Sequence, residues 1–179
     1  NTGYMGAGIF QCLMLKTTNG GLNWTEQNLG LLYGPRSMNF INSSTGVAAH
    51  QQGDILKTTN SGVNWLSINT SISYNTCVWQ SSLSVLYAAG SASICKSTDG
   101  GNNWVTQTTN SGDILSICFT DTDNGMAAGR NGLMLRTSNG GLNWNTITVS
   151  GMYDIFMVRY LNASTVFACG QGGALGKST

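Results

Sequence analysis

A nine-residue motif recurs at nearly equal intervals along this chain of 179 residues. One copy reads Lys-Ser-Thr-Asp-Gly-Gly-Asn-Asn-Trp, and the four copies occupy Lys16–Trp24, Lys57–Trp65, Lys96–Trp104 and Arg136–Trp144. The tryptophans at positions 24, 65, 104 and 144 are therefore 41, 39 and 40 residues apart. A fixed period near 40 residues means that one supersecondary unit is repeated, and this constrains the fold more than any local pattern.

Within the motif, short oxygen-bearing side chains precede a glycine and a tryptophan. The side chains of Ser97 and Asp99 are suited to accept hydrogen bonds from backbone N–H groups in a turn. Gly101 tolerates the positive φ of a tight connection, and Trp104 is expected to start the returning strand and bury its ring beneath the turn. Each copy is thus predicted to be a capped hairpin with a hydrophobic anchor. The structural residues of the four copies are Thr17, Asn19, Gly21, Trp24, Thr58, Asn60, Gly62, Trp65, Ser97, Asp99, Gly101, Trp104, Thr137, Asn139, Gly141 and Trp144.

The segments between the motifs read as short strands. In the second repeat, strands are predicted at Ser37–Ile41, Val47–His50, Asp54–Thr59 and Asn64–Asn69. Turn signals every 8 to 12 residues leave no room for long helices. The repeats are placed at 1–34 (partial), 35–75, 76–112, 113–152 and 153–179 (partial). The pattern predicts one all-β domain, a β-propeller of four-stranded antiparallel blades with three full and two partial blades.

The motif resembles the Asp-box, or bacterial neuraminidase repeat, and its recurrence beside strands ending in Ala-Ala-Gly is similar to the photosystem II assembly-factor-like propellers of secreted bacterial surface proteins. The resemblance implies that each box lies between the third and fourth strands of a blade, away from the ligand-binding centre. It also implies a ring of about seven blades, of which this chain would be an arc with its first and last repeats apart. The remaining blades would come from the parent chain or another subunit. An extracellular or cell-surface location in bacteria is expected, with the targeting segment outside this chain.

Two further sets of equivalent residues, one residue or pair from each repeat and here called columns, are expected in the core. One aromatic residue per blade is predicted to fill the layer between adjacent sheets, at positions Phe40, Trp79, Phe119 and Tyr160. Small residues in the second strand are expected to let neighbouring sheets approach closely, as in the pairs Ala48-Ala49, Ala88-Ala89, Ala127-Ala128 and Ala168-Cys169.

A basic residue opens every copy of the motif. Its aliphatic stem is expected to cover apolar surface while its charged end reaches solvent. The alternative is a cationic band around the ring that contacts an anionic partner. The residues of this column are Lys16, Lys57, Lys96, Arg136 and Lys177.

Composition argues against several function classes. Charged residues make up 8% of the chain and the net charge is +1, so a nucleic-acid partner is not expected. No apolar run is long enough for insertion into a membrane. The five cysteines form no Cys-x-x-Cys pair and His50 is the only histidine, so neither a metal nor a cofactor is predicted. The cysteines are expected to be small buried hydrophobes, with one disulfide possible.

The carboxylates do not suggest an active site. Glycosidases need two positioned carboxylates, and the candidates outside turns are Asp54, Asp113 and Asp154. The four arginines occupy unlike positions in the repeats, which does not match the arginine cluster of a sialidase. The chain is therefore predicted to be a non-catalytic binding or scaffold propeller that makes protein or adhesive contacts. The alternative is a glycan-binding or sialidase-like glycoside hydrolase module whose catalytic residues lie outside this chain.

Overall fold

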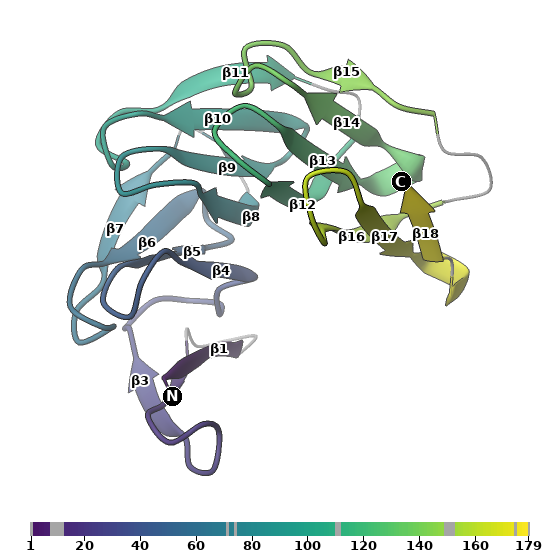
Figure 1. Cartoon of the computed structure of the whole chain (residues 1–179). Coiled ribbons are helices and arrows are strands. Elements are labelled where there is room, and N and C mark those ends of the chain that lie inside the picture. The colour runs from purple at the N-terminus through teal and green to yellow at the C-terminus, as the bar shows by residue number, and fades with distance from the viewer. Residues whose placement is uncertain are drawn as a thin grey trace.

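A computed structural model describes residues 2–7, 13–70, 72–73, 75–109, 112–148, 153–173 and 175–178. Within these residues, eighteen strands pair into five antiparallel sheets, numbered here 1 to 5 in chain order. Figure 1 shows the sheets along an open arc, with sheets 1 and 5 apart at its two ends. This is the arrangement of blades in a β-propeller, as the repeat predicts. No helix of the described residues is long and apolar enough to cross a membrane.

The sheets follow the chain as consecutive up-and-down units. Sheet 1 consists of β1 (Gly3–Ala7), β2 (Leu13–Thr17) and β3 (Thr25–Asn28). Sheet 2 consists of β4 (Ser37–Phe40), β5 (Gly46–Ala49), β6 (Asp54–Thr58) and β7 (Leu66–Asn69). Sheet 3 consists of β8 (Asn75–Gln80), β9 (Leu86–Gly90), β10 (Ser93–Ser97) and β11 (Val105–Thr109). Sheet 4 consists of β12 (Ile114–Phe119), β13 (Gly125–Gly129), β14 (Met134–Thr137) and β15 (Asn145–Thr146). Sheet 5 consists of β16 (Ile155–Tyr160), β17 (Val166–Gly170) and β18 (Leu175–Ser178).

In sheets 2 to 5 the first strand lies on the inside of the arc, as Figure 1 shows for β4, β8, β12 and β16. Two 3-10 turns, η1 (Arg130–Gly132) and η2 (Gln171–Gly173), follow the second strands of sheets 4 and 5. Each motif connects the last two strands of its sheet, where the resemblance to Asp-box propellers places it.

The prediction that the tryptophan starts the returning strand is wrong by one residue. β11 begins at Val105, directly after Trp104. The reason is that the turn has not yet ended at Asn103, whose backbone N–H still donates to the Asp99 carboxylate at 2.9 Å. The same offset occurs in sheets 1, 2 and 4.

The core lies between the sheets as one apolar layer per neighbouring pair. The layer between sheets 3 and 4, for example, contains Tyr87, Ile94, Ile117 and Leu135, all at most 2% exposed. The second-strand alanines have no exposed surface at all, which agrees with the predicted close approach of the sheets. They are Ala48, Ala49, Ala88, Ala89, Ala127 and Ala128. In sheet 5, Ala168 is buried but Cys169 is exposed.

All four predicted aromatic residues contact the layers between sheets, but Trp79 does not occupy the same place in its strand as the other three. Phe40, Phe119 and Tyr160 each end an inner strand, and Phe119 pairs with Gly125 across the hairpin. In sheet 3 the equivalent residue is Gln80, which pairs with Leu86. Trp79 therefore lies on the opposite face of β8, where it packs in the layer between sheets 3 and 4. Spacing alone misaligned it because the connections between blades differ in length by one residue.

Replacing Phe119 by alanine tests this description of the core. Its ring is 5% exposed, lies 4.0 Å from the Tyr87 ring centre in a stacked arrangement, and meets Trp144 edge-on at 5.9 Å. We expect Phe119→Ala to lower the free energy of unfolding by about 3–5 kcal/mol in urea denaturation. Leu142→Ala is the control, because this side chain is 71% exposed and its loss should cost about 0.5 kcal/mol or less. If both substitutions lowered the free energy of unfolding equally, the layered core would be contradicted.

Candidate functional site

Each Asp-box turn is closed by its own side chains, as the box of sheet 3 shows. The Ser97 hydroxyl accepts a hydrogen bond from the Gly101 N–H at 2.8 Å and donates to the Asp99 carboxylate at 2.8 Å. The carboxylate in turn accepts from the Asn103 N–H. Gly101 has a φ of 94°, in the region that glycine adopts at little cost. The Ser97 hydroxyl and the Asp99 carboxylate are thus used to close the turn.

The other three boxes repeat these bonds with asparagine in place of aspartate. The threonine hydroxyl accepts from the box glycine N–H at 2.9–3.0 Å, and the asparagine Oδ1 accepts from the N–H four residues later at 2.9–3.0 Å. These bonds belong to Thr17 and Asn19, Thr58 and Asn60, and Thr137 and Asn139. The negative charge of Asp99 is therefore not required for the geometry.

The tryptophans differ in burial between the boxes. Trp65, Trp104 and Trp144 are partly buried and pack against the core layers. Trp24 in sheet 1 is 39% exposed. The tryptophan therefore acts as a hydrophobic anchor only where its ring packs against the preceding sheet. Within the described residues, the box of sheet 1 makes no such contact.

The basic column joins neighbouring sheets. The ammonium of Lys57 in sheet 2 donates to the Gly100 carbonyl in the box of sheet 3 at 2.5 Å. Lys96 in sheet 3 likewise donates to the Gly140 carbonyl in sheet 4 at 2.7 Å. Lys16 in sheet 1 donates to the Ser61 carbonyl in sheet 2 at 2.5 Å. In each of these boxes the acceptor is the carbonyl of the residue just before the last glycine. We call this group the box carbonyl.

Two tyrosines reinforce this contact. Tyr4 pairs with Lys16 across the β1–β2 hairpin, and its hydroxyl donates to the same Ser61 carbonyl at 2.6 Å. Tyr87, the partner of Lys96, donates to the Gly140 carbonyl at 3.0 Å. Burial raises the pKa of Tyr87 to about 12, so its hydroxyl keeps the proton that it donates.

For three of the five basic residues these contacts differ from both interpretations, because the charged end reaches neither solvent nor an anionic partner. The charged ends of three lysines are bound to box carbonyls and do not form a free cationic band. Arg136 and Lys177 occupy the same place in sheets 4 and 5 and are exposed. Contact with an anionic partner therefore remains a hypothesis for these two residues.

A second capped turn in each repeat was not recognised as a column from the sequence. It connects the first two strands of sheets 2 to 5, and its first polar side chain accepts from the N–H groups two and three residues later. The spacing of 40, 39 and 41 residues is the signal that could have found it. The capping residues are Asn42, Ser82, Asp121 and Asn162.

Two of the candidate catalytic carboxylates share one arginine. The Arg130 guanidinium lies 3.5 Å from Asp113 and 3.2 Å from Asp154, and the Asn131 N–H also donates to Asp154 at 3.0 Å. Arg130 and Asp113 are about half exposed, so this ion pair adds little stability. Both carboxylates therefore have partners within the chain.

The other candidate catalytic residues, Asp54 and His50, also have hydrogen-bond partners. Asp54 accepts a hydrogen bond from the Ser67 hydroxyl at 2.8 Å. His50 is completely buried, and its Nε2 lies 2.6 Å from the Leu32 carbonyl. Within the described residues, no cluster of histidine, cysteine and acidic side chains could hold a metal ion.

The cysteines of the described residues are free thiols, and three of the four are buried. Burial raises the pKa of Cys77 to about 12 and that of Cys118 to about 11, so neither forms a reactive thiolate near neutral pH. Both behave as small hydrophobes, as does Cys95. Cys12 lies outside the described residues, so a disulfide that includes it stays a prediction.

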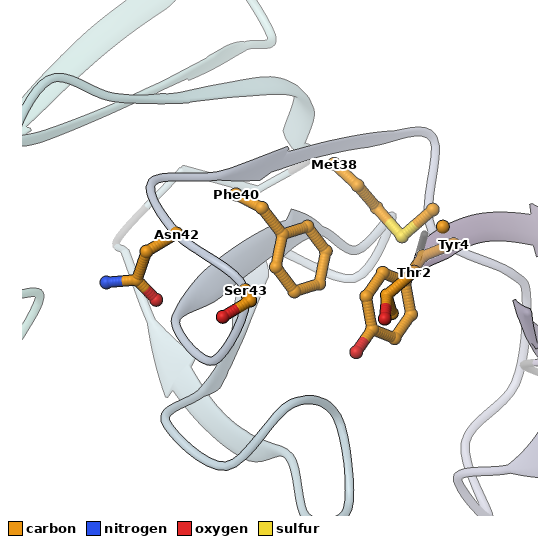
Figure 2. Close-up of a pocket in the computed structure, with 7 residues that line it drawn as sticks. Thr2, Tyr4, Met38, Phe40, Asn42 and Ser43 are labelled. Carbon is orange, nitrogen blue, oxygen red and sulfur yellow. The ribbon is translucent and has the colours of Figure 1, made fainter. Parts of the chain in front are cut away.

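One hollow opens between sheets 1 and 2. It has a volume of about 460 Å³. Figure 2 shows the rings of Tyr4 and Phe40 face to face in its wall, and their centres are 4.2 Å apart. The hollow is lined by Thr2, Gly3, Tyr4, Met38, Phe40, Asn42 and Ser43. Its apolar and aromatic wall suits a side chain or a peptide segment better than a charged ligand.

Comparisons with known proteins agree with this geometry. A family model described as "Photosynthesis system II assembly factor YCF48" matches residues 66–138. The chain has the fold of a β-propeller whose turns carry Asp-box hydrogen bonds. The structure of YCF48 bound to D1 peptide is similar over 93% of this chain and 72% of that chain, with a TM-score of 0.55 and 17% identity. No curated protein matches the sequence significantly.

Two GH74 enzymes are also similar to this chain in fold. The GH74 enzyme of Niastella koreensis matches 99% of this chain with a TM-score of 0.79 and 19% identity, over 34% of its own length. An ancestral GH74 enzyme matches 80% of this chain with a TM-score of 0.69 and 19% identity. The chain spans only 22% of that enzyme, and at these identities the likeness concerns the fold.

The lysine contacts predict that replacing equivalent basic residues lowers the free energy of unfolding by different amounts. We expect Lys57→Met to lower the free energy of unfolding by about 1–2 kcal/mol, because the Gly100 carbonyl loses a charged donor. Lys96→Met should cost less, since the Tyr87 hydroxyl still donates to the Gly140 carbonyl. Lys177→Met is the exposed control and should change little. Chemical denaturation of the three variants checks this order, and equal costs would contradict a link between sheets.

The box of sheet 3 predicts a pH effect on stability. Hydrogen bonds from the backbone N–H and then the side chain of Asn103 lower the pKa of Asp99 from 3.8 to about 2. Because the folded pKa is depressed, the carboxylate stabilises the fold fully above about pH 4, and this contribution is lost as the pH falls towards 2. Asp99→Asn does not titrate, so the stability difference between the variant and the parent protein should shrink over that range. A difference that stays constant from pH 5 to pH 2 would refute these bonds.

Proposed function

We propose that this chain is a non-catalytic propeller that binds a protein partner. The observation that carries the proposal is the state of its acidic residues. Asp99 and Asp121 cap turns, Asp54 accepts from Ser67, and Asp113 and Asp154 share Arg130. These carboxylates are used within the molecule, and a glycosidase needs two that face a substrate.

The comparisons support a protein partner over the alternative. The Asp-box propeller YCF48 is solved in complex with a D1 peptide, and the family model for that protein matches the middle of this chain. The hollow between sheets 1 and 2, lined by two aromatic rings and a thioether, offers a place for an apolar side chain of such a partner. A secreted or cell-surface location and adhesive contacts, which the sequence resemblance implies, are part of this proposal.

The alternative function is a glycan-active module, which the likeness to GH74 enzymes keeps in view. We expect no release of sugar when the purified chain is incubated with sialosides and β-glucans. Turnover that disappears in Asp113→Asn or Asp154→Asn would overturn the non-catalytic proposal. Leu142→Ala, an exposed change in the box of sheet 4, serves as the control.

A binding assay distinguishes a protein partner from a glycan partner. The chain is immobilised and exposed to extracts of its source organism, either untreated, enzymatically deglycosylated or digested with a protease. We expect retention of a partner that survives deglycosylation and is lost after proteolysis. Retention that is lost on deglycosylation would instead assign a glycan ligand to the propeller.

A further inference from the structure

The turns that connect the first two strands of sheets 2 and 5 share a sequence pattern that the proposed function does not use. Each contains the triplet Asn-x-Ser, at residues 42–44 and 162–164. A triplet of asparagine, any residue but proline, and serine or threonine is the acceptor sequence for N-linked glycans in secreted proteins. Because a chain rich in asparagine, serine and threonine contains this triplet by chance, the sequence alone is a weak signal. The triplet also occurs at residues 23–25 and 69–71.

The two turns hold their asparagines in the same geometry. The Asn42 Oδ1 accepts hydrogen bonds from the backbone N–H groups of Ser44 at 2.9 Å and Thr45 at 2.7 Å. The Ser44 hydroxyl also donates to this oxygen at 3.0 Å. Asn162 of sheet 5 accepts the equivalent three bonds at 3.0, 2.9 and 3.1 Å. The oxygen of each asparagine amide is therefore bound within its own turn.

The nitrogen of the same amide group is available. Asn42 and Asn162 are exposed, and neither Nδ2 donates a hydrogen bond to another described residue. Figure 2 shows the Asn42 oxygen directed towards Ser43 and the nitrogen directed away from it. A sugar attached to Nδ2 leaves the oxygen where it is, so the turn would keep all three hydrogen bonds. The fold can therefore carry a modification at this nitrogen without losing a contact.

The equivalent turn of sheet 4 differs in both respects. Its asparagine, Asn124, is followed by Gly125 and Met126 and so belongs to no acceptor triplet. The Asn124 Nδ2 donates to the two carboxylate oxygens of Asp121 at 3.1 and 3.0 Å. A substituent on this nitrogen would disturb those bonds, which makes Asn124 an internal control.

The other two acceptor triplets do not have the geometry of sheets 2 and 5. In the triplet at Asn69, the middle residue Thr70 is completely buried and its hydroxyl donates to the Gly53 carbonyl at 2.9 Å. In the triplet at Asn23, the third residue Thr25 belongs to β3 and pairs with Lys16. The structure therefore distinguishes two of the four triplets.

Both turns lie on the face of the arc that carries the boxes. Antiparallel strands place the first turn and the box at the same end of each sheet, and in sheet 2 the Ser61 N–H donates to the Ser44 carbonyl at 2.8 Å. Aliphatic side chains are exposed on this face, and one of them directly precedes Asn162. Glycans are bulky and solubilising, so two of them here would shield these side chains. The exposed aliphatic residues are Leu22, Val63, Leu83, Leu142 and Leu161.

We propose that Asn42 and Asn162 are acceptor sites for N-linked glycans. The co-substrate is an oligosaccharide carried on a lipid diphosphate, which is transferred to proteins as they cross a membrane. The asparagine Nδ2 forms a bond to the anomeric carbon of the sugar, and the bond between that carbon and the diphosphate oxygen breaks. The diphosphate leaves with the electron pair, and one amide proton passes to a base of the transferase. The inference rests on the secreted or cell-surface location in the proposed function.

Mass spectrometry of the protein isolated from its source organism tests the proposal. After proteolysis, we expect an oligosaccharide on the peptides that contain Asn42 and Asn162. The peptides that contain Asn23, Asn69 and Asn124 should be unmodified. If Asn42 and Asn162 are both recovered without a glycan, the proposal is overturned. A single sugar residue at these positions would instead overturn the assignment of the donor to a preassembled oligosaccharide.

Substitutions in the turn of sheet 2 separate the acceptor triplet from the fold. Ser44→Ala breaks the triplet but leaves the two backbone bonds to the Asn42 Oδ1, so the chain should still fold, as circular dichroism would show. Produced in the same organism, this variant should lose the glycan at Asn42 and keep the one at Asn162. Ser44→Thr retains a hydroxyl and should keep both glycans.

Ser43→Ala is the matched control for these variants. It changes the neighbouring serine of the same turn and gives Asn-Ala-Ser, which is the natural triplet of sheet 5. This variant should keep both glycans. Equal glycan occupancy at Asn42 in Ser44→Ala and Ser43→Ala would refute recognition of the triplet.

Two further outcomes separate the glycan sites from the proposed function. If the protein is found outside the cell with neither asparagine modified, the sites are refuted while the location and protein binding stand. If both glycans are present but the chain retains no protein partner in the binding assay, protein binding is refuted and the sites stand.

Discussion

The contact between one sheet and the box of the next is the interaction on which this fold depends. Each blade is too thin to bury its own apolar residues, so its core exists only between sheets. The lysine of one sheet reaches the box carbonyl of the next at three junctions, with 2.5–2.7 Å between nitrogen and oxygen. A charged donor thereby satisfies a carbonyl that the turn presents towards its neighbour, and it fixes the position of one blade on another.

This view changes the meaning of the Asp-box. Its local hydrogen bonds shape the turn, but its repeated geometry also presents one carbonyl and, in sheets 2 and 4, one close-packed glycine to the preceding sheet. A Cβ atom on Gly62 would lie 2.9 Å from the Tyr4 ring, and one on Gly141 would lie 3.2 Å from the Tyr87 ring. The glycine is therefore needed for close approach as well as for its positive φ.

The sequence predicted what depends on nearby residues and missed what depends on pairing. The strands and the capped boxes follow from a repeat of about 40 residues, because their contacts lie within one unit. The buried alanines follow from their constant place in that repeat. The bond from Lys57 to Gly100 joins residues 43 positions apart, and no single-sequence pattern states which groups meet across two blades. Counting residues also placed Trp79 where strand pairing places Gln80.

Hydrogen exchange at the box glycines tests most directly whether the boxes are links between blades. The amides of Gly21, Gly62, Gly101 and Gly141 make the same bond to the box hydroxyl, at 2.8–3.0 Å. Only the last three boxes receive a lysine from a preceding sheet within the described residues. The account predicts slow exchange at Gly62, Gly101 and Gly141 and clearly faster exchange at Gly21. Equal protection at all four amides would show that the turns are held by their local bonds alone, and would contradict it.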